Sequence, residues 1–165
     1  IDVHLMVNHP EDIIPMCLEA GADIISFHPE TANNKIFRLL NQIKDAGKKC
    51  GVVLNPATPE ESIAEYAHLL DKVTVMSVDP GYAGQKFIPE SLNKIRKLIN
   101  MRKNNGYHYL TEIDGSCNEK TFGQIAESGV DVFIVGTSGL FSLHEDVSQA
   151  WDRMIEIFQR ETVAA

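Results

Sequence analysis

Short β-rich runs alternate with longer amphipathic runs along the whole chain, and this alternation constrains the fold more than any other feature. The apolar stretches of the β-rich runs, such as Val52-Val53-Leu54 and Phe133-Ile134-Val135, are almost uninterrupted. Such strands are typical of a parallel sheet that is covered on both faces. The pattern therefore predicts an α/β protein of six βα units. The predicted strands are Val3–Val7, Asp23–Phe27, Lys49–Leu54, Lys72–Val78, Tyr109–Ile113 and Asp131–Val135.

Local signals predict where several helices begin and end. Thr58-Pro59-Glu60-Glu61 has the form of a capping box, so a helix is predicted to start there with Thr58 as its N-cap. The longest helical pattern runs from Pro89 to about Asn104 and stops at Asn105-Gly106. Glycines stand where predicted helices pass into the next strand, at Gly21, Gly47 and Gly129.

Composition and charge exclude several classes of partner. The 165 residues are 44% hydrophobic and 23% charged, which suits one soluble domain with one core. The formal net charge of -8 argues against a nucleic-acid partner, because no dense basic patch is available to neutralise phosphates. We found no membrane-spanning apolar run and no secretory signal pattern, which predicts a cytoplasmic protein with no membrane partner. The three cysteines are far apart in sequence and are predicted to be reduced thiols: Cys17, Cys50 and Cys117.

Polar residues follow every predicted strand. In parallel α/β folds the catalytic groups gather at the carboxyl ends of the strands. His4 and Asp114 are side chains that bind divalent ions, although two ligands alone do not define a metal site and a hydrogen-bonded core histidine is the alternative for His4. Asp114, which Gly115 follows, is also suited to proton transfer. His28 and Glu30, after the second strand, are expected to pair with one another or to support the rim.

Two glycine-containing loops are candidates for ligand binding. Gly136-Thr137-Ser138-Gly139 can offer backbone N–H groups and hydroxyls to a phosphate, with Gly115-Ser116 as the neighbouring loop, or it is a plain strand-to-helix turn. Gly81-Tyr82-Ala83-Gly84-Gln85 can close over a bound ligand. Met6 and Met76 stand at comparable strand positions and are either core residues or an uncharged pocket lining.

Six blocks, spread over essentially the whole chain, match one known family in order and spacing. They are His4–Val7, Phe27–Glu30, Asn55–Pro59, Met76–Pro89, Asp114–Ser116 and Gly136–Ser138. Together they resemble the ribulose-phosphate 3-epimerase family. Details such as His28-Pro29-Glu30-Thr31 and Asp114-Gly115-Ser116 are most similar to the D-allulose-6-phosphate branch of that family.

The resemblance implies a (β/α)₈ barrel that inverts C3 of a ketose phosphate by two-carboxylate acid/base chemistry through an enediolate. It implies D-allulose 6-phosphate as the substrate and D-fructose 6-phosphate as the product, with D-ribulose 5-phosphate as the alternative substrate. It also implies one divalent metal (Zn, Mn, Co, Fe or Mg), with Asp114 as catalytic residue and metal ligand and His4 as a second ligand. The implied substrate-binding residues are His4, Met6, Met76, Gly81, Tyr82, Ala83, Gly84, Asp114, Gly115, Ser116, Gly136, Thr137 and Ser138.

The chain departs from the family pattern at its beginning. In the family, a His-x-Asp on an earlier strand supplies the second carboxylate and two more metal ligands, whereas this chain opens directly on Ile1-Asp2-Val3-His4. A (β/α)₈ barrel has ~250 residues, about 31 for each unit. We therefore expect residues 1–165 to be a single barrel domain that lacks its first two βα units and does not epimerise alone, and a homo-oligomer at full length.

Two other functions are weighed against an epimerase. A related phosphate-binding decarboxylase would carry a Lys between carboxylates at a strand end, and we found no Asp-x-Lys at one. A non-catalytic remnant that binds a sugar phosphate is the alternative from another class.

Overall fold

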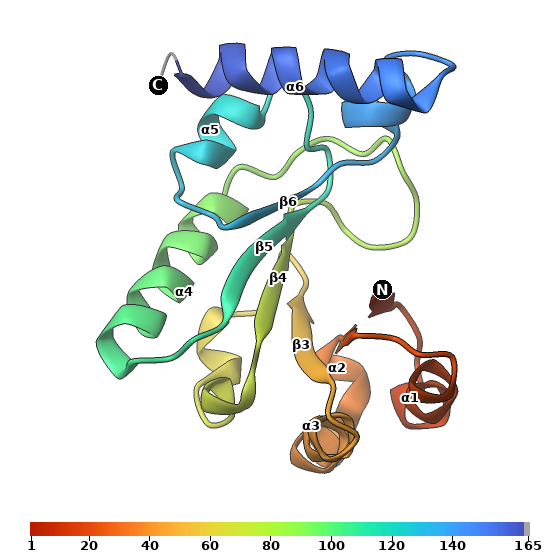
Figure 1. Cartoon of the computed structure of the whole chain (residues 1–165). Coiled ribbons are helices and arrows are strands. Elements are labelled where there is room, and N and C mark those ends of the chain that lie inside the picture. The colour runs from red at the N-terminus through yellow and green to blue at the C-terminus, as the bar shows by residue number, and fades with distance from the viewer. Residues whose placement is uncertain (164–165) are drawn as a thin grey trace.

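The strands form one parallel sheet. In the computed structural model, which describes residues 1–163, six strands lie side by side in the order in which they occur in the sequence (Figure 1). They are β1 (Asp2–Leu5), β2 (Ile24–Phe27), β3 (Lys49–Leu54), β4 (Lys72–Met76), β5 (Leu110–Asp114) and β6 (Val132–Ile134). Each neighbouring pair is parallel. The sheet is curled into part of a barrel, as the βα alternation and the family resemblance predicted.

Helices connect the strands and lie around the outside of the curled sheet (Figure 1). The α-helices are α1 (Pro10–Glu19), α2 (Pro29–Ala32), α3 (Ile36–Asp45), α4 (Ser91–Asn105), α5 (Phe122–Ala126) and α6 (Val147–Val163). Short 3₁₀ turns occupy Asn33–Lys35, Glu60–Ile63 and Ala67–Leu69, and one π-helical turn spans Thr137–Phe141. Among the described residues, no helix is both long and apolar enough to cross a membrane.

The main core lies between the strands and the helices. Successive residues of a strand point to opposite faces, and in β4 the outward residues Val73 and Val75 join the core cluster with Val52 of β3 and Ile113 of β5. Helix residues such as Leu40 pack against them from outside. The nearly continuous apolar runs of the sequence therefore reflect outward residues that pack under helices and inward residues that line the barrel.

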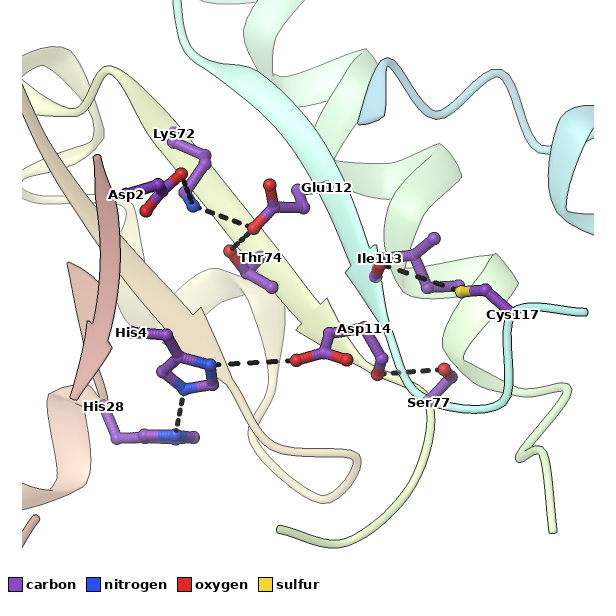
Figure 2. Close-up of polar contacts among 10 residues, drawn as sticks. All are labelled: Asp2, His4, His28, Lys72, Thr74, Ser77, Glu112, Ile113, Asp114 and Cys117. Atoms are coloured by element: carbon purple, nitrogen blue, oxygen red, sulfur yellow. Dashed lines mark hydrogen bonds and ion pairs between the residues drawn. The ribbon is translucent and has the colours of Figure 1, made fainter. Parts of the chain in front are cut away.

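The inward face also carries charge. The Lys72 ammonium group of β4 lies 2.6 Å from Asp2 of β1 and 2.8 Å from Glu112 of β5, and the Thr74 hydroxyl donates to the same Glu112 carboxylate at 2.7 Å (Figure 2). Lys72 and Glu112 are buried, so these contacts are shielded from water. The cluster links three strands across the concave side of the sheet.

The glycine and helix-stop signals were correct. Gly21, Gly47 and Gly129 have φ of +86°, +72° and +79°, in the region that favours glycine. Helix α4 ends at Asn105, and Gly106 caps it with φ +67°. The predicted strand ends lie within two residues of those in the structure.

The capping box at Thr58 was a wrong prediction. The residue that precedes the first turn is Pro59, whose ψ of 145° is extended, and the turn is a 3₁₀ segment rather than an α-helix. The Thr58 hydroxyl donates instead to the carboxylate of Glu30, which also accepts from Asn55 at 3.1 Å. A tertiary carboxylate has therefore replaced the local backbone N–H as the partner of Thr58.

The ion cluster predicts a large effect of removing its cation. Lys72→Met leaves Asp2 and Glu112 as facing carboxylates on the inner face, and we expect it to lower the free energy of unfolding by about 3–5 kcal/mol, measured by urea denaturation. Adding Glu112→Gln should recover part of this loss, because it removes a stranded charge. As a control, Arg160→Met, which breaks only exposed ion pairs, should leave the urea midpoint nearly unchanged. An undiminished stability of Lys72→Met would contradict a structural role for the cluster.

Candidate active site

His4 and Asp114 face each other at the carboxyl edge of the sheet. Nδ1 of His4, on β1, lies 3.8 Å from Oδ2 of Asp114, the last residue of β5. Both side chains are partly exposed, at 19% and 26%. The two strands are not neighbours in the sheet, so the sequence could predict a shared edge but not this approach. Figure 2 shows the His4 ring between Asp114 and a second histidine.

The second histidine is His28, which directly follows β2. Its Nε2 lies 2.9 Å from Nε2 of His4, and the two ring centroids are 5.0 Å apart. Burial lowers the pKa of His28, and the neighbouring His4 lowers that pKa further. The His28 ring does not pair with Glu30, as one of the two expectations had it, because the Glu30 carboxylate accepts hydrogen bonds from Asn55 and Thr58. The contact with His4 was missed because it depends on side chains of two strands meeting on one face.

A cavity of about 540 Å³ opens beside Asp114. Every predicted substrate-binding residue except His4 lines it: Met6, Met76, Gly81, Tyr82, Ala83, Gly84, Asp114, Gly115, Ser116, Gly136, Thr137 and Ser138. Gln85, from the loop that was predicted to close over a ligand, lines it too. The other lining residues were not predicted as site residues: Val78, Asp79, Pro80, Cys117 and Ile134. Most of these directly adjoin predicted residues, so wider boundaries around the same motifs would have included them. The structure thus brings the ends of β4, β5 and β6, and the loops that follow them, together around one cavity.

The loop after β4 is fastened to the loop after β5. The side-chain amide of Gln85 donates to the backbone carbonyls of Asp79 and Tyr82, which holds the loop in a closed turn. The Ser116 hydroxyl donates to the Gln85 carbonyl oxygen, and Ser116 itself has φ +51°. A non-glycine residue in this backbone region carries strain. Ser116 therefore combines a strained backbone with a contact that joins the two walls of the cavity.

The loop after β6 closes the far wall of the cavity. Its Ser138 hydroxyl accepts a hydrogen bond from the Asn118 side-chain amide at 3.2 Å. A Cβ at Gly139 would overlap the carbonyl oxygen of Cys117, whereas a Cβ at Gly136 would meet open space. Burial raises the pKa of the Cys117 thiol to about 12, so at neutral pH it is a neutral wall residue and not a thiolate nucleophile.

The donor set of His4 and Asp114 fits a divalent ion in part. An imidazole nitrogen and a carboxylate oxygen suit Zn, Mn or Fe, and their 3.8 Å separation is less than twice the ~2.0–2.2 Å of a typical metal–ligand bond. Within residues 1–163, however, no group of three or more His, Cys, Asp and Glu side chains has the spacing of a metal site. A fixed ion needs further ligands beyond these two.

Comparison with known proteins decides the family. The model of the ribulose-phosphate 3 epimerase family matches residues 1–141, which include all the loops around the cavity. The chain belongs to this family.

Curated relatives agree with that membership. Ribulose-phosphate 3-epimerases of Buchnera aphidicola and Aquifex aeolicus are each 43% identical to the chain, over 141 and 149 residues (86% and 90% of the chain). That of Escherichia coli K12 is 42% identical over 138 residues, or 84% of the chain. The aligned part amounts to 61%, 66% and 61% of these three relatives, so the chain spans less than two thirds of their length.

Solved structures support the fold. The 3-hexulose-6-phosphate synthase of Salmonella typhimurium superposes with a TM-score of 0.63 at 19% identity, over 97% of this chain and 72% of that one. A mutant tryptophan synthase α-subunit of Pyrococcus furiosus gives 0.62 at 14% identity, over 92% and 60%. At such identities the likeness concerns the fold alone.

The packing of the loop after β6 predicts different outcomes for two similar substitutions. Gly139→Ala places a methyl group against the Cys117 backbone, and we expect a loss of about 1–3 kcal/mol in the free energy of unfolding. Gly136→Ala, three residues earlier in the same loop, adds its methyl group into open space and should keep the stability of the parent. Chemical denaturation of both variants checks this, and equal stabilities would show that the loop is not packed as described.

Proposed function

We propose that the protein epimerises a ketose phosphate at C3, with Asp114 as one of its acid/base groups. The observation that carries this proposal is the Asp114 carboxylate, which faces His4 and lines the cavity. Membership of the ribulose-phosphate 3-epimerase family and the names of the relatives support it. Because the chain spans less than two thirds of those relatives, the proposal concerns the protein at the full length of its reading frame.

Epimerisation at C3 needs two acid/base groups and a site for the phosphate, and this chain has candidates for one acid/base group and for the phosphate site. The hydrogen on C3 is acidic because C2 is a carbonyl, so a carboxylate such as Asp114 can remove it from one face of the sugar. A second acid must return a proton from the opposite face to invert the centre. We propose that Gly136–Ser138 and Gly115–Ser116 hold the phosphate through backbone N–H groups and hydroxyls, and that Met6 and Met76 line the reacting carbons without competing as proton donors.

His4 and Asp114 are the residues of this chain that would hold a divalent ion. Such an ion, when bound, stabilises negative charge that develops on the substrate oxygens. His4 would then be a neutral ligand that offers a nitrogen lone pair to the ion. Asp114 would bind the ion and also transfer the proton.

D-Ribulose 5-phosphate is the substrate we propose first, because the relatives that cover most of the chain are named ribulose-phosphate 3-epimerases. D-Allulose 6-phosphate is the second candidate. Ser116, which lines the cavity, matches the allulose branch in the sequence resemblance, and its contact with Gln85 shapes the loop that would cover the sugar.

Asp114→Asn tests the proposed role directly. In the protein expressed from its complete reading frame, we expect kcat for C3 epimerisation to fall by about 10²–10⁴-fold, because the amide cannot exchange the proton. The two substrates are compared in the same assay, and the higher kcat/KM identifies the preferred one. Asp152→Asn, at an exposed position of α6, serves as the control and should keep full activity. A folded Asp114→Asn variant with activity close to that of the parent would refute the assignment.

A further inference from the structure

His28 is a buried histidine that the proposed reaction does not use. Its residue is only 4% exposed, and its Nδ1 has no hydrogen-bond partner among the described residues. Buried polar atoms are nearly always paired, so an unpaired one needs an explanation. Within residues 1–163, the other ring nitrogen has one hydrogen-bond partner, Nε2 of His4 at 2.9 Å.

The backbone fixes where this ring lies. His4 pairs with Ser26 in the β1–β2 ladder, and His28 follows Ser26 by two residues, so both histidines point to the inner face of the sheet. The carbonyl oxygen of His28 accepts hydrogen bonds from the backbone N–H of Thr31 at 3.1 Å and from its hydroxyl at 2.9 Å. These bonds fix the backbone of His28 at the start of α2, and the His28 ring lies against the ring of His4 (Figure 2).

Proton placement gives the contact a direction. A neutral imidazole carries one N–H and one lone pair. For Nδ1 of His4, which faces Asp114, to offer its lone pair to a cation, the proton of His4 must sit on Nε2. That N–H then points at Nε2 of His28, which must accept it, and the proton of His28 moves to the unpaired Nδ1. The unpaired nitrogen is thus the cost of holding His4 in one tautomer.

We propose that His28 is a positioning residue, which accepts a hydrogen bond from Nε2–H of His4 and so aims the lone pair of His4 Nδ1 toward Asp114. Partners of this kind, one step removed from a metal, fix the tautomer and orientation of a ligating histidine. This inference rests on the proposed function, because it assigns a purpose to the His4 ligand. His28 itself is not assigned as a ligand.

The test compares two substitutions in the protein expressed from its complete reading frame. His28→Leu removes the acceptor, whereas His28→Gln keeps an acceptor oxygen near the position of Nε2. The tautomer of His4 is read from its ¹⁵N chemical shifts without metal, and the affinity for Mn²⁺ alone is measured by calorimetry. His68→Leu, at an exposed position, is the matched control.

We expect the parent and His28→Gln to show a protonated Nε2 on His4, and His28→Leu to show a mixture of tautomers. The dissociation constant for Mn²⁺ should rise 10–100-fold in His28→Leu, with most of the affinity kept in His28→Gln and all of it in His68→Leu. Thermal unfolding of each variant separates a positioning role from a structural one, since leucine is close to histidine in volume and should leave the protein folded.

The outcomes distinguish the positioning role of His28 from the proposed metal-dependent reaction. Unchanged His4 shifts and unchanged Mn²⁺ affinity in a folded His28→Leu variant would overturn the positioning role. If His28→Leu does not fold, the parent shifts decide: a His4 proton on Nδ1 overturns the proposal, and one on Nε2 that persists in His28→Gln supports it. A parent that binds no Mn²⁺, but whose His4 shifts still respond to His28→Leu, would support the positioning of the ring and contradict the metal-dependent reaction.

Discussion

The curl of the sheet is the constraint on which the candidate site depends. Neighbouring parallel strands lie about 4.8 Å apart, so four steps across a flat sheet would separate β1 from β5 by roughly 19 Å. Nδ1 of His4 on β1 nevertheless lies 3.8 Å from the carboxylate of Asp114 on β5. Only a sheet curled toward a barrel brings these two side chains to one point, and the loops around the cavity converge for the same reason (Figure 1).

Two layers of polar contacts span that curl on its inner face. Below the carboxyl edge, Lys72 bridges Asp2 and Glu112, and at the edge His4 faces Asp114 (Figure 2). Each upper residue follows a lower one by two positions on the same strand, as Asp2 precedes His4 and Glu112 precedes Asp114. The buried ions cost desolvation energy, but they fix how β1 stands against β5. The contacts of Lys72 with Asp2 and Glu112 therefore help to set the distance between His4 and Asp114.

The sequence predicted what depends on local pattern and missed contacts between side chains that are distant in sequence. Strands, glycine turns and the end of α4 follow from periodicity and backbone preference, and the motifs at strand ends indicated the residues that surround the cavity. The contact between His4 and His28 could not be read from the chain, because it needs the register of β1 against β2. The predicted helix cap at Thr58 was wrong for a related reason. Its hydroxyl donates a hydrogen bond to Glu30, which is distant in sequence, instead of capping a helix.

Hydrogen exchange at C3 of the ketose phosphate reports whether Asp114 moves the proton of that carbon. The protein expressed from its complete reading frame is incubated in D₂O with D-ribulose 5-phosphate or D-allulose 6-phosphate, and the C3 proton is followed by NMR. We expect deuterium to enter at C3 of at least one substrate as its epimer forms, and Asp114→Asn to abolish formation of the deuterated epimer. Epimer formation without deuterium at C3, or formation of the deuterated epimer by Asp114→Asn at the parent rate, would refute this role of Asp114.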